Sequence, residues 1–234
     1  MSWPIKEKRG VIPACDVDDL KQLEKLVKET NSVKGITAYK VGFMLAMNFG
    51  LPATVKTIRK HSSKPIIYDH QKAATDIPET AEGFMKACRQ AGIDAVILFP
   101  FTGPETEKQW IESAKKEKLG VIVGGEMTHK GFSESEGGFI SAEESVKIYE
   151  IAIENGVKNF VVPGNKPDKI KKYRELFEKK GVDYTLYSPG LVAQGGSISE
   201  SGKAAGSRWH AIVGRGIYSA ADMKKAAEEL CREM

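Results

Sequence analysis

The chain has 234 residues, and its 35 Lys and Arg against 31 Asp and Glu leave a formal charge of +4 at pH 7. With 41% hydrophobic and 28% charged residues it can build a packed core, which excludes an intrinsically disordered protein. No apolar run reaches the roughly 18 residues of a membrane span and the N-terminus has no signal-peptide core, so we expect a cytoplasmic protein with no membrane partner.

Eight short apolar segments, each bounded by Gly, Pro, Asp or Asn, are predicted as strands. They are apolar at successive positions, which suits strands covered on both faces, as in a parallel sheet wrapped by helices. The segments begin at Val11, Ile36, Pro65, Ala95, Gly120, Asn159, Asp183 and His210. Their starts lie 24 to 39 residues apart, close to one strand plus one helix each.

Amphipathic stretches alternate with these strands. In the first, Leu20, Leu23 and Leu26 share one face, which is the periodicity of a helix. Further helices are expected at 79–91, 104–117, 142–155 and 167–180 and from Met223 to Leu230. Strand and helix alternate eight times in a chain of this length. This predicts a single-domain (β/α)8 TIM barrel over residues 1–234.

Polar residues stand where the predicted strands end, which is where such barrels place their chemistry. The first three strands lead to Asp16, Lys40 and the run DHQKAATD from Asp69 to Asp76. The later strands lead to Glu126, Thr128 and His129, to Ser188 and Pro189, and to Gly214 and Arg215. Two lysines and three aspartates at one barrel mouth predict a catalytic centre.

Two of these positions allow more than one interpretation. Asp16 either caps a helix that starts at Val17 or Asp18, or contacts a ligand. Lys40 interrupts an apolar strand, where an unpaired ammonium group is costly, so it must meet a carboxylate or a water-filled site.

Metal and nucleic-acid binding are not expected. His70, His129 and the three cysteines lack the close spacing of metal-ligand motifs. Basic residues are interleaved with acidic residues along the expected helices, which is typical of a solvated face and not of a nucleic-acid partner.

The last two strand ends predict a phosphate site. Gln194-Gly195-Gly196 and Gly214-Arg215-Gly216 supply small residues that let a backbone approach a ligand closely. The Arg215 guanidinium can bind phosphate through two hydrogen bonds. A phosphorylated small molecule is therefore the expected ligand.

From the first strand to the last, the chain resembles the orotidine 5′-phosphate decarboxylase family. The matching pieces are Asp16, YKVGF around Lys40, IIYDHQKAATDIPET from Ile66, EMTH from Glu126, SPGLVAQGG from Ser188 and VGRGIY from Val213. The resemblance implies decarboxylation of orotidine 5′-phosphate to uridine 5′-phosphate, in pyrimidine nucleotide biosynthesis, without metal or organic cofactor. It also implies that Lys72 protonates C6 of the pyrimidine, within an alternating charge network of Lys40, Asp69 and Asp76.

The same resemblance implies the substrate-binding residues. Asp16 and Lys40 would meet ribose hydroxyls, and Thr128 would contact the pyrimidine. Gln194, Gly214 and Arg215 would hold the phosphate, with Pro189 also at the substrate. Asp76, Ile77 and Thr80 would act in the neighbouring subunit's site, which implies a homodimer.

The spacing of the charged motif leaves two alignments open. The family motif is D-x-K-x-x-D, whereas D-H-Q-K-A-A-T-D is one residue longer in both gaps. A β-bulge beside the site would let Asp69 and Lys72 both face the pocket. An ungapped alignment anchored on Lys72 instead puts His70 and Thr75 at the Asp positions, which would dismantle the charge network.

Two alternative functions, and two loop segments that would cover the site, are also predicted. The alternative functions are a metal-dependent sugar-phosphate decarboxylase or aldolase of the same barrel suite, and a non-catalytic barrel that binds a phosphometabolite. The Gly- and Ser-rich segment 190–202 is the expected lid over the site. The polar segment 128–140 is a second possible cover without an assigned role.

Overall fold

The computed structural model describes residues 3–70 and 73–234, and within these ranges eight parallel strands form one sheet. They are β1 (Arg9–Pro13), β2 (Tyr39–Gly42), β3 (Ile66–Asp69), β4 (Ala95–Leu98), β5 (Gly120–Gly124), β6 (Asn159–Val161), β7 (Thr185–Ser188) and β8 (Trp209–Val213). Each lies within, or within two residues of, a segment predicted as a strand. The eight predicted strands are therefore confirmed.

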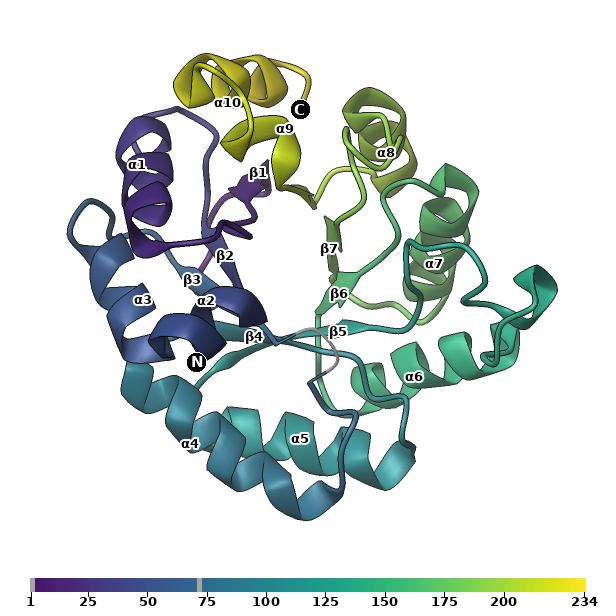
Figure 1. Ribbon diagram of the computed structural model, residues 1–234. Coiled ribbons are helices and arrows are strands. Elements are labelled where there is room, and N and C mark those ends of the chain that lie inside the picture. The colour runs from purple at the N-terminus through teal and green to yellow at the C-terminus, as the bar shows by residue number, and fades with distance from the viewer. Residues whose placement is uncertain (1–2, 71–72) are drawn as a thin grey trace.

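The sheet curls into a nearly closed barrel (Figure 1). Strands follow the order β1-β8-β7-β6-β5-β4-β3-β2, with β1 pairing β8 from Arg9 opposite Trp209 onward. Between β1 and β2 only isolated parallel bridges are formed in the described residues, at Val11 with Ile36 and at Ala14 with Lys40. The second bridge places the start of the β1 loop beside Lys40, at the mouth of the barrel.

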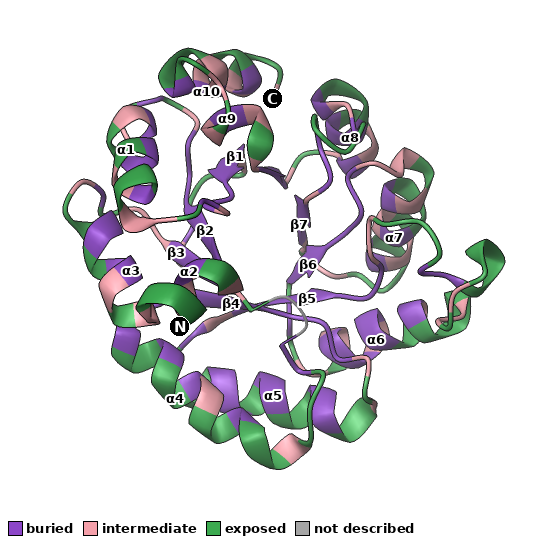
Figure 2. Cartoon of the chain, viewed as in Figure 1, coloured by how far each residue is buried: buried purple, intermediate pink, exposed green. Residues whose placement is uncertain are grey.

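Helices surround the strands and turn their buried faces inward (Figure 2). They are α1 (Leu20–Thr30), α2 (Phe43–Phe49), α3 (Leu51–Arg59), α4 (Ala81–Ala91), α5 (Pro104–Lys116), α6 (Ala142–Glu154), α7 (Pro167–Lys179), α8 (Ile198–Ala205), α9 (Arg215–Tyr218) and α10 (Met223–Arg232), with the 3-10 turns η1 (Pro78–Thr80) and η2 (Glu134–Glu136). Within the described ranges, no helix is both long enough and apolar enough to cross a membrane.

The core has two apolar layers, one inside the barrel and one around it. One contains strand residues such as Ile12, Ile67, Ile122 and Ile212 but no helix residue, so it lies inside the barrel. The other lies between the strands and the helices. Because burying each such side chain stabilises the fold by about 1.5–3 kcal/mol, the interior layer gives the barrel mouth a rigid base.

Several local expectations are corrected by the structure. Helices α2, α3, α8 and α9 were not predicted. Six of the seven residues of α2 are apolar, so it shows no alternation of apolar and polar faces, while α8 is built largely from Ser, Gly and Ala. The last third of the expected lid is therefore helix, starting after the N-cap Ser197. The cap of α1 is Asp19, whose carboxylate accepts from two backbone N–H groups, so the capping interpretation of Asp16 is wrong.

Candidate active site

A cavity of about 300 Å³ opens at the carboxyl ends of the strands. Eight of the twelve predicted site residues line it: Asp16, Lys40, Asp69, Thr128, Pro189, Gln194, Gly214 and Arg215. They come from six different strand ends, as expected for a barrel whose chemistry lies at one face. The strand ends read from the sequence therefore lead to this cavity.

Lys40 lies between two carboxylates on the floor of the cavity. Its Nζ donates to Asp16 Oδ1 at 3.0 Å and to Asp69 Oδ2 at 3.3 Å, with only 6% of the side chain exposed. Burial alone would lower the pKa of Lys40, but Asp69 and Asp16 outweigh it and raise the pKa above its usual value. Lys40 is therefore a permanent cation, and the expectation that it must meet a carboxylate is correct.

The strand ends are shaped to bring these charges together. Gly42 ends β2 opposite Asp69 on β3, and a side chain at Gly42 would collide with the Asp16 carboxylate. The missing side chain thus lets the β1 loop fold over the end of β2. Cys15 donates its N–H to the Lys40 carbonyl at 2.8 Å, which fixes Asp16 beside the ammonium group.

After β3, consecutive side chains point in opposite directions. Asp69 lines the cavity, whereas His70 contacts the Tyr68 hydroxyl and lies with its ring 5.6 Å from that of Phe84 on α4. The residue beside Lys40 is thus Asp69 and not His70, which favours the gapped alignment of the motif. Gln71 and Lys72 lie outside the described residues, as does most of the expected bulge.

The predicted residues Asp76, Ile77 and Thr80 do not line this chain's cavity. Their segment is tied to the neighbouring loop and helix, because the Asp76 carbonyl accepts from Thr102 at 3.1 Å and from Thr106 at 3.0 Å. All three predicted residues are exposed, with Ile77 58% exposed. The segment is therefore held firmly, and these three side chains are exposed outside the cavity lining of their own chain.

The loops after β7 and β8 also line the cavity. Gly190 has a φ of +87°, and a side chain there would lie 2.7 Å from Thr128, so this position needs glycine. The loop closes through Val192, whose N–H donates to the Gly196 carbonyl at 2.7 Å. Arg215 stands exposed at the start of α9, with its guanidinium available to an anion.

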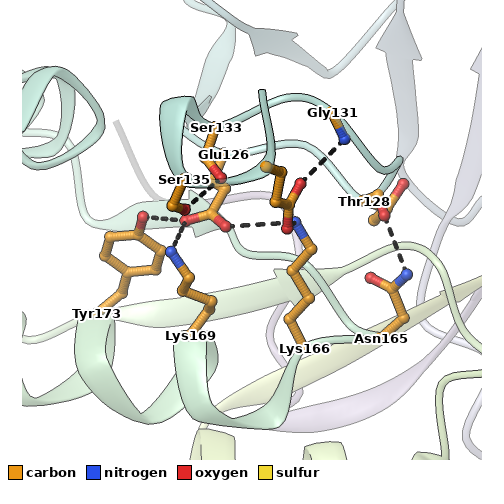
Figure 3. Close-up of polar contacts among 10 residues, drawn as sticks. Glu126, Thr128, Gly131, Ser133, Ser135, Asn165, Lys166, Lys169 and Tyr173 are labelled. Atoms are coloured by element: carbon orange, nitrogen blue, oxygen red, sulfur yellow. Dashed lines mark hydrogen bonds and ion pairs between the residues drawn. The ribbon is translucent and has the colours of Figure 1, made fainter. Parts of the chain in front are cut away.

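One buried cluster at the cavity wall was not predicted from the sequence. Glu126 was noted there as a polar residue at a strand end, but its partners Lys166, Lys169 and Tyr173 were not (Figure 3). These partners belong to the segment that follows β6, where the strand itself ends without a charged residue. The available signal was the pair of lysines around Pro167, at the start of a helix.

No group of three or more His, Cys, Asp or Glu side chains in residues 3–70 and 73–234 is arranged to hold a metal ion. The charged groups at the mouth are instead organised as ion pairs. A cavity lined by a fixed cation, two carboxylates and an arginine can bind a phosphorylated molecule and act on it by electrostatics.

Comparisons with known proteins point to one family. The family model described as "Orotidine 5'-phosphate decarboxylase / HUMPS family" matches residues 10–230. The chain is 35% identical to orotidine 5′-phosphate decarboxylase of Methanosarcina mazei, over 96% of this chain and 94% of the relative. It is 30% identical to the same enzyme of Methanosphaera stadtmanae, over 95% and 96%.

A solved structure gives the same result at the level of the fold. The orotidine 5′-monophosphate decarboxylase of Methanocaldococcus jannaschii, in complex with the inhibitor BMP, superposes with a TM-score of 0.83. It is 28% identical, and the match covers 96% of this chain and 98% of that one.

Proposed function

This chain belongs to the orotidine 5′-phosphate decarboxylase / HUMPS family and decarboxylates orotidine 5′-phosphate to uridine 5′-phosphate, and from this premise we propose which of its residues perform the reaction. The observation that carries the proposal is Lys40, buried between Asp16 and Asp69 on the floor of the cavity. Burying these charges costs free energy that their ion pairs must offset, and all three residues line the cavity, where their charges can act on a ligand.

The reaction defines what the site must supply. When the bond between C6 and the carboxylate breaks, CO2 leaves and the electron pair stays on C6, where the ring offers no easy sink. A nearby cation must stabilise this pair and then deliver a proton. We assign that role to Lys72, three residues after Asp69 and outside the described residues.

Asp69 and Lys40 would prepare the substrate for this step. A fixed carboxylate beside the departing carboxylate disfavours the bound substrate more than the transition state, in which that charge is leaving. Lys40 holds Asp69 in place because its ammonium group also pairs with Asp16. The network is preorganised before substrate arrives, so little reorganisation is needed during the reaction.

The two ends of the cavity would bind the two ends of the nucleotide. Gln194, Gly214 and Arg215 line one end, where small residues and a guanidinium suit a phosphate. Thr128 and Pro189 would contact the pyrimidine, and Asp16 and Lys40 would meet the ribose hydroxyls.

We also assign Asp76, Ile77 and Thr80 to the site of a second copy of the chain, in a homodimer. Their exposure and their absence from the lining of the chain's own cavity support this assignment. Asp76 of one chain would then complete the charge network that Lys40, Asp69 and Lys72 begin in the other.

A single assay tests the reaction and the proton donor. The fall in ultraviolet absorbance of orotidine 5′-phosphate is followed with purified protein in excess chelator, beside the Lys72→Ala variant and an exposed control on α4, Lys86→Ala. We expect turnover in chelator that Lys72→Ala abolishes while the control keeps it. Full activity of Lys72→Ala would remove Lys72 from the reaction, and a need for added metal would contradict a cofactor-free mechanism.

Subunit mixing tests the assignment of Asp76. Lys72→Ala and Asp76→Asn are each expected to be inactive as pure proteins. Mixed and allowed to exchange subunits, they should recover about a quarter of wild-type activity, because half of the dimers then contain one intact site. If Asp76 acted within its own chain, every site in the mixture would carry a lesion and no activity would return.

A further inference from the structure

Behind the cavity wall, the carboxylate of Glu126 is held by three groups of the segment that contains α7 (Figure 3). Glu126 is 2% exposed. It lies two residues after the end of β5 and belongs to the lining of the cavity. Lys169 Nζ lies 3.4 Å from Oε2 and Lys166 Nζ lies 3.6 Å from Oε1, while the Tyr173 hydroxyl donates a hydrogen bond.

A second set of contacts joins the same segment to the residues after Glu126. Asn165 donates to the carbonyl oxygen of Thr128 at 3.0 Å. Lys166 also pairs with Glu136 in η2 at 2.9 Å, and Glu136 in turn accepts the N–H of Gly131. The stretch from Glu126 to Glu136 is therefore attached to the start of α7 at several points, with Thr128 between them.

With Glu136 included, the cluster holds two carboxylates and two ammonium groups, so its charges balance. An isolated buried carboxylate would be very unfavourable, but two ammonium groups offset its charge. Burial raises the pKa of Tyr173, with Tyr149 and Glu126 acting in the same direction, so its hydroxyl stays protonated and donates a hydrogen bond to Glu126. Glu126 Oε1 accepts no hydrogen bond from the described residues, so the ion pair with Lys166 constrains that atom.

We propose that Glu126 is a positioning residue, whose carboxylate, clamped by α7, fixes Met127 and Thr128 against the base end of the cavity. This rests on the proposed function, in which Thr128 contacts the pyrimidine. Glu126 contacts no reacting atom in this role, because its carboxylate is directed at α7 while Lys40 and Asp69 occupy the cavity floor. Its effect is on the geometry of the backbone that meets the base.

The base and the phosphate of the ligand should depend on different parts of the chain. The base end depends on the segment that Glu126 fixes, whereas Arg215, at the phosphate end, belongs to the start of α9 after β8. Loss of the Glu126 charge should therefore weaken a ligand that has a base more than a ligand that has only the sugar phosphate. A general loss of stability would weaken both equally.

The experiment compares uridine 5′-phosphate with ribose 5-phosphate in calorimetric titrations of wild type and Glu126→Gln. We expect the affinity for uridine 5′-phosphate to fall about tenfold, since two half-buried ammonium groups lose the carboxylate that they share, and that for ribose 5-phosphate to stay within about twofold. The KM for orotidine 5′-phosphate should rise more than kcat falls. Glu175→Gln, the same change at an exposed position of α7, is the matched control and should alter neither ligand.

Equal losses for both ligands, or unchanged binding of both, would overturn the positioning role. If Glu126→Gln does not fold, Tyr173→Phe replaces it, because it removes one hydroxyl and no charge. A selective loss of about threefold for uridine 5′-phosphate then supports the proposal, and unchanged affinities overturn it. Absence of wild-type turnover would refute the proposed function itself, whereas normal turnover with an unchanged affinity ratio would refute only the role of Glu126.

Discussion

Two buried charge clusters at the mouth of this barrel have the same design with opposite signs. In one, the ammonium of Lys40 lies between two carboxylates, at 3.0 and 3.3 Å. In the other, the carboxylate of Glu126 lies between two ammonium groups, at 3.4 and 3.6 Å. Both central residues are almost completely buried, with 6% of the Lys40 side chain and 2% of the Glu126 side chain exposed.

The clusters differ in what their outer members face. Asp16 and Asp69 line the cavity, so the Lys40 cluster presents charge to a ligand. Lys166 and Lys169 belong to the N-cap and first turn of α7, so the Glu126 cluster joins two segments of the protein. Burial and ion pairing alone therefore do not identify a catalytic group, and the direction of the charged atoms must be known.

Removing the centre of the catalytic cluster should have the largest effect. Lys40→Met leaves the carboxylates of Asp16 and Asp69 close together without a cation, so kcat/KM for orotidine 5′-phosphate should fall by about a thousandfold or more. Steady-state kinetics by absorbance measure it, with circular dichroism to verify folding. Activity within tenfold of wild type would remove the distinction between the two clusters.

A change outside both clusters should affect binding and not chemistry. Arg215→Ala removes the guanidinium at the phosphate end, so the affinity for uridine 5′-phosphate should fall by roughly a hundredfold. The control is Arg232→Ala near the end of α10, which should bind normally. Competition binding measures both, and an unchanged affinity of Arg215→Ala would place the phosphate elsewhere.

A buried group that belongs to neither cluster should control part of the acid stability. His210 is fully buried beside Thr37, and burial lowers its pKa from 6.5 to about 4. Below pH 6.5 the unfolded chain binds this proton more readily than the folded chain, so stability falls as the pH drops toward 4. The difference in pKa corresponds to about 3 kcal/mol, all of which is present above pH 6.5.

His210→Gln tests this by removing the titrating group. Urea unfolding at pH 7 and at pH 4.5 gives the loss of stability on acidification for each protein. We expect the loss to be clearly smaller in the variant, whatever its absolute stability. An equal loss in both proteins would assign the acid sensitivity to the carboxylates of the two clusters.

The smallest effect is expected at the outer edge of the Glu126 cluster. Glu136 is exposed and pairs with Lys166 at 2.9 Å, so solvent screens the interaction. Glu136→Gln should change the affinity for uridine 5′-phosphate by less than about twofold and Tm by about one degree or less. A loss as large as that of Glu126→Gln would mean that η2, and not α7, positions Thr128.

The Lys40 cluster could be predicted from the sequence better than the Glu126 cluster. Asp16, Lys40 and Asp69 follow or interrupt apolar strands, and parallel strands in a barrel bring their carboxyl ends together, so local pattern is sufficient. Lys166, Lys169 and Tyr173 meet Glu126 through long-range packing of α7, which no local pattern encodes. On an amphipathic helix, lysines are indistinguishable from those of a solvated face.

The direction of the side chains after β3 also could not be predicted. The extra residue in the motif allowed either Asp69 or His70 to face the pocket, since successive residues of a strand alternate between faces. The pairing of Gly42 with Asp69, and the contacts of His70 with Tyr68 and Phe84, decide the register. These are tertiary contacts that the alternation of apolar residues does not specify.

The most direct test of the distinction between the two clusters is kcat at saturating orotidine 5′-phosphate for Asp69→Asn and for Glu126→Gln. A group that acts on the reacting bond changes kcat, whereas a group that positions the base-binding segment acts mainly on KM. We predict a loss in kcat of about a hundredfold or more for Asp69→Asn and of less than about tenfold for Glu126→Gln. Equal losses, or the reverse order, would contradict the assignment of catalysis to the Lys40 cluster and positioning to the Glu126 cluster.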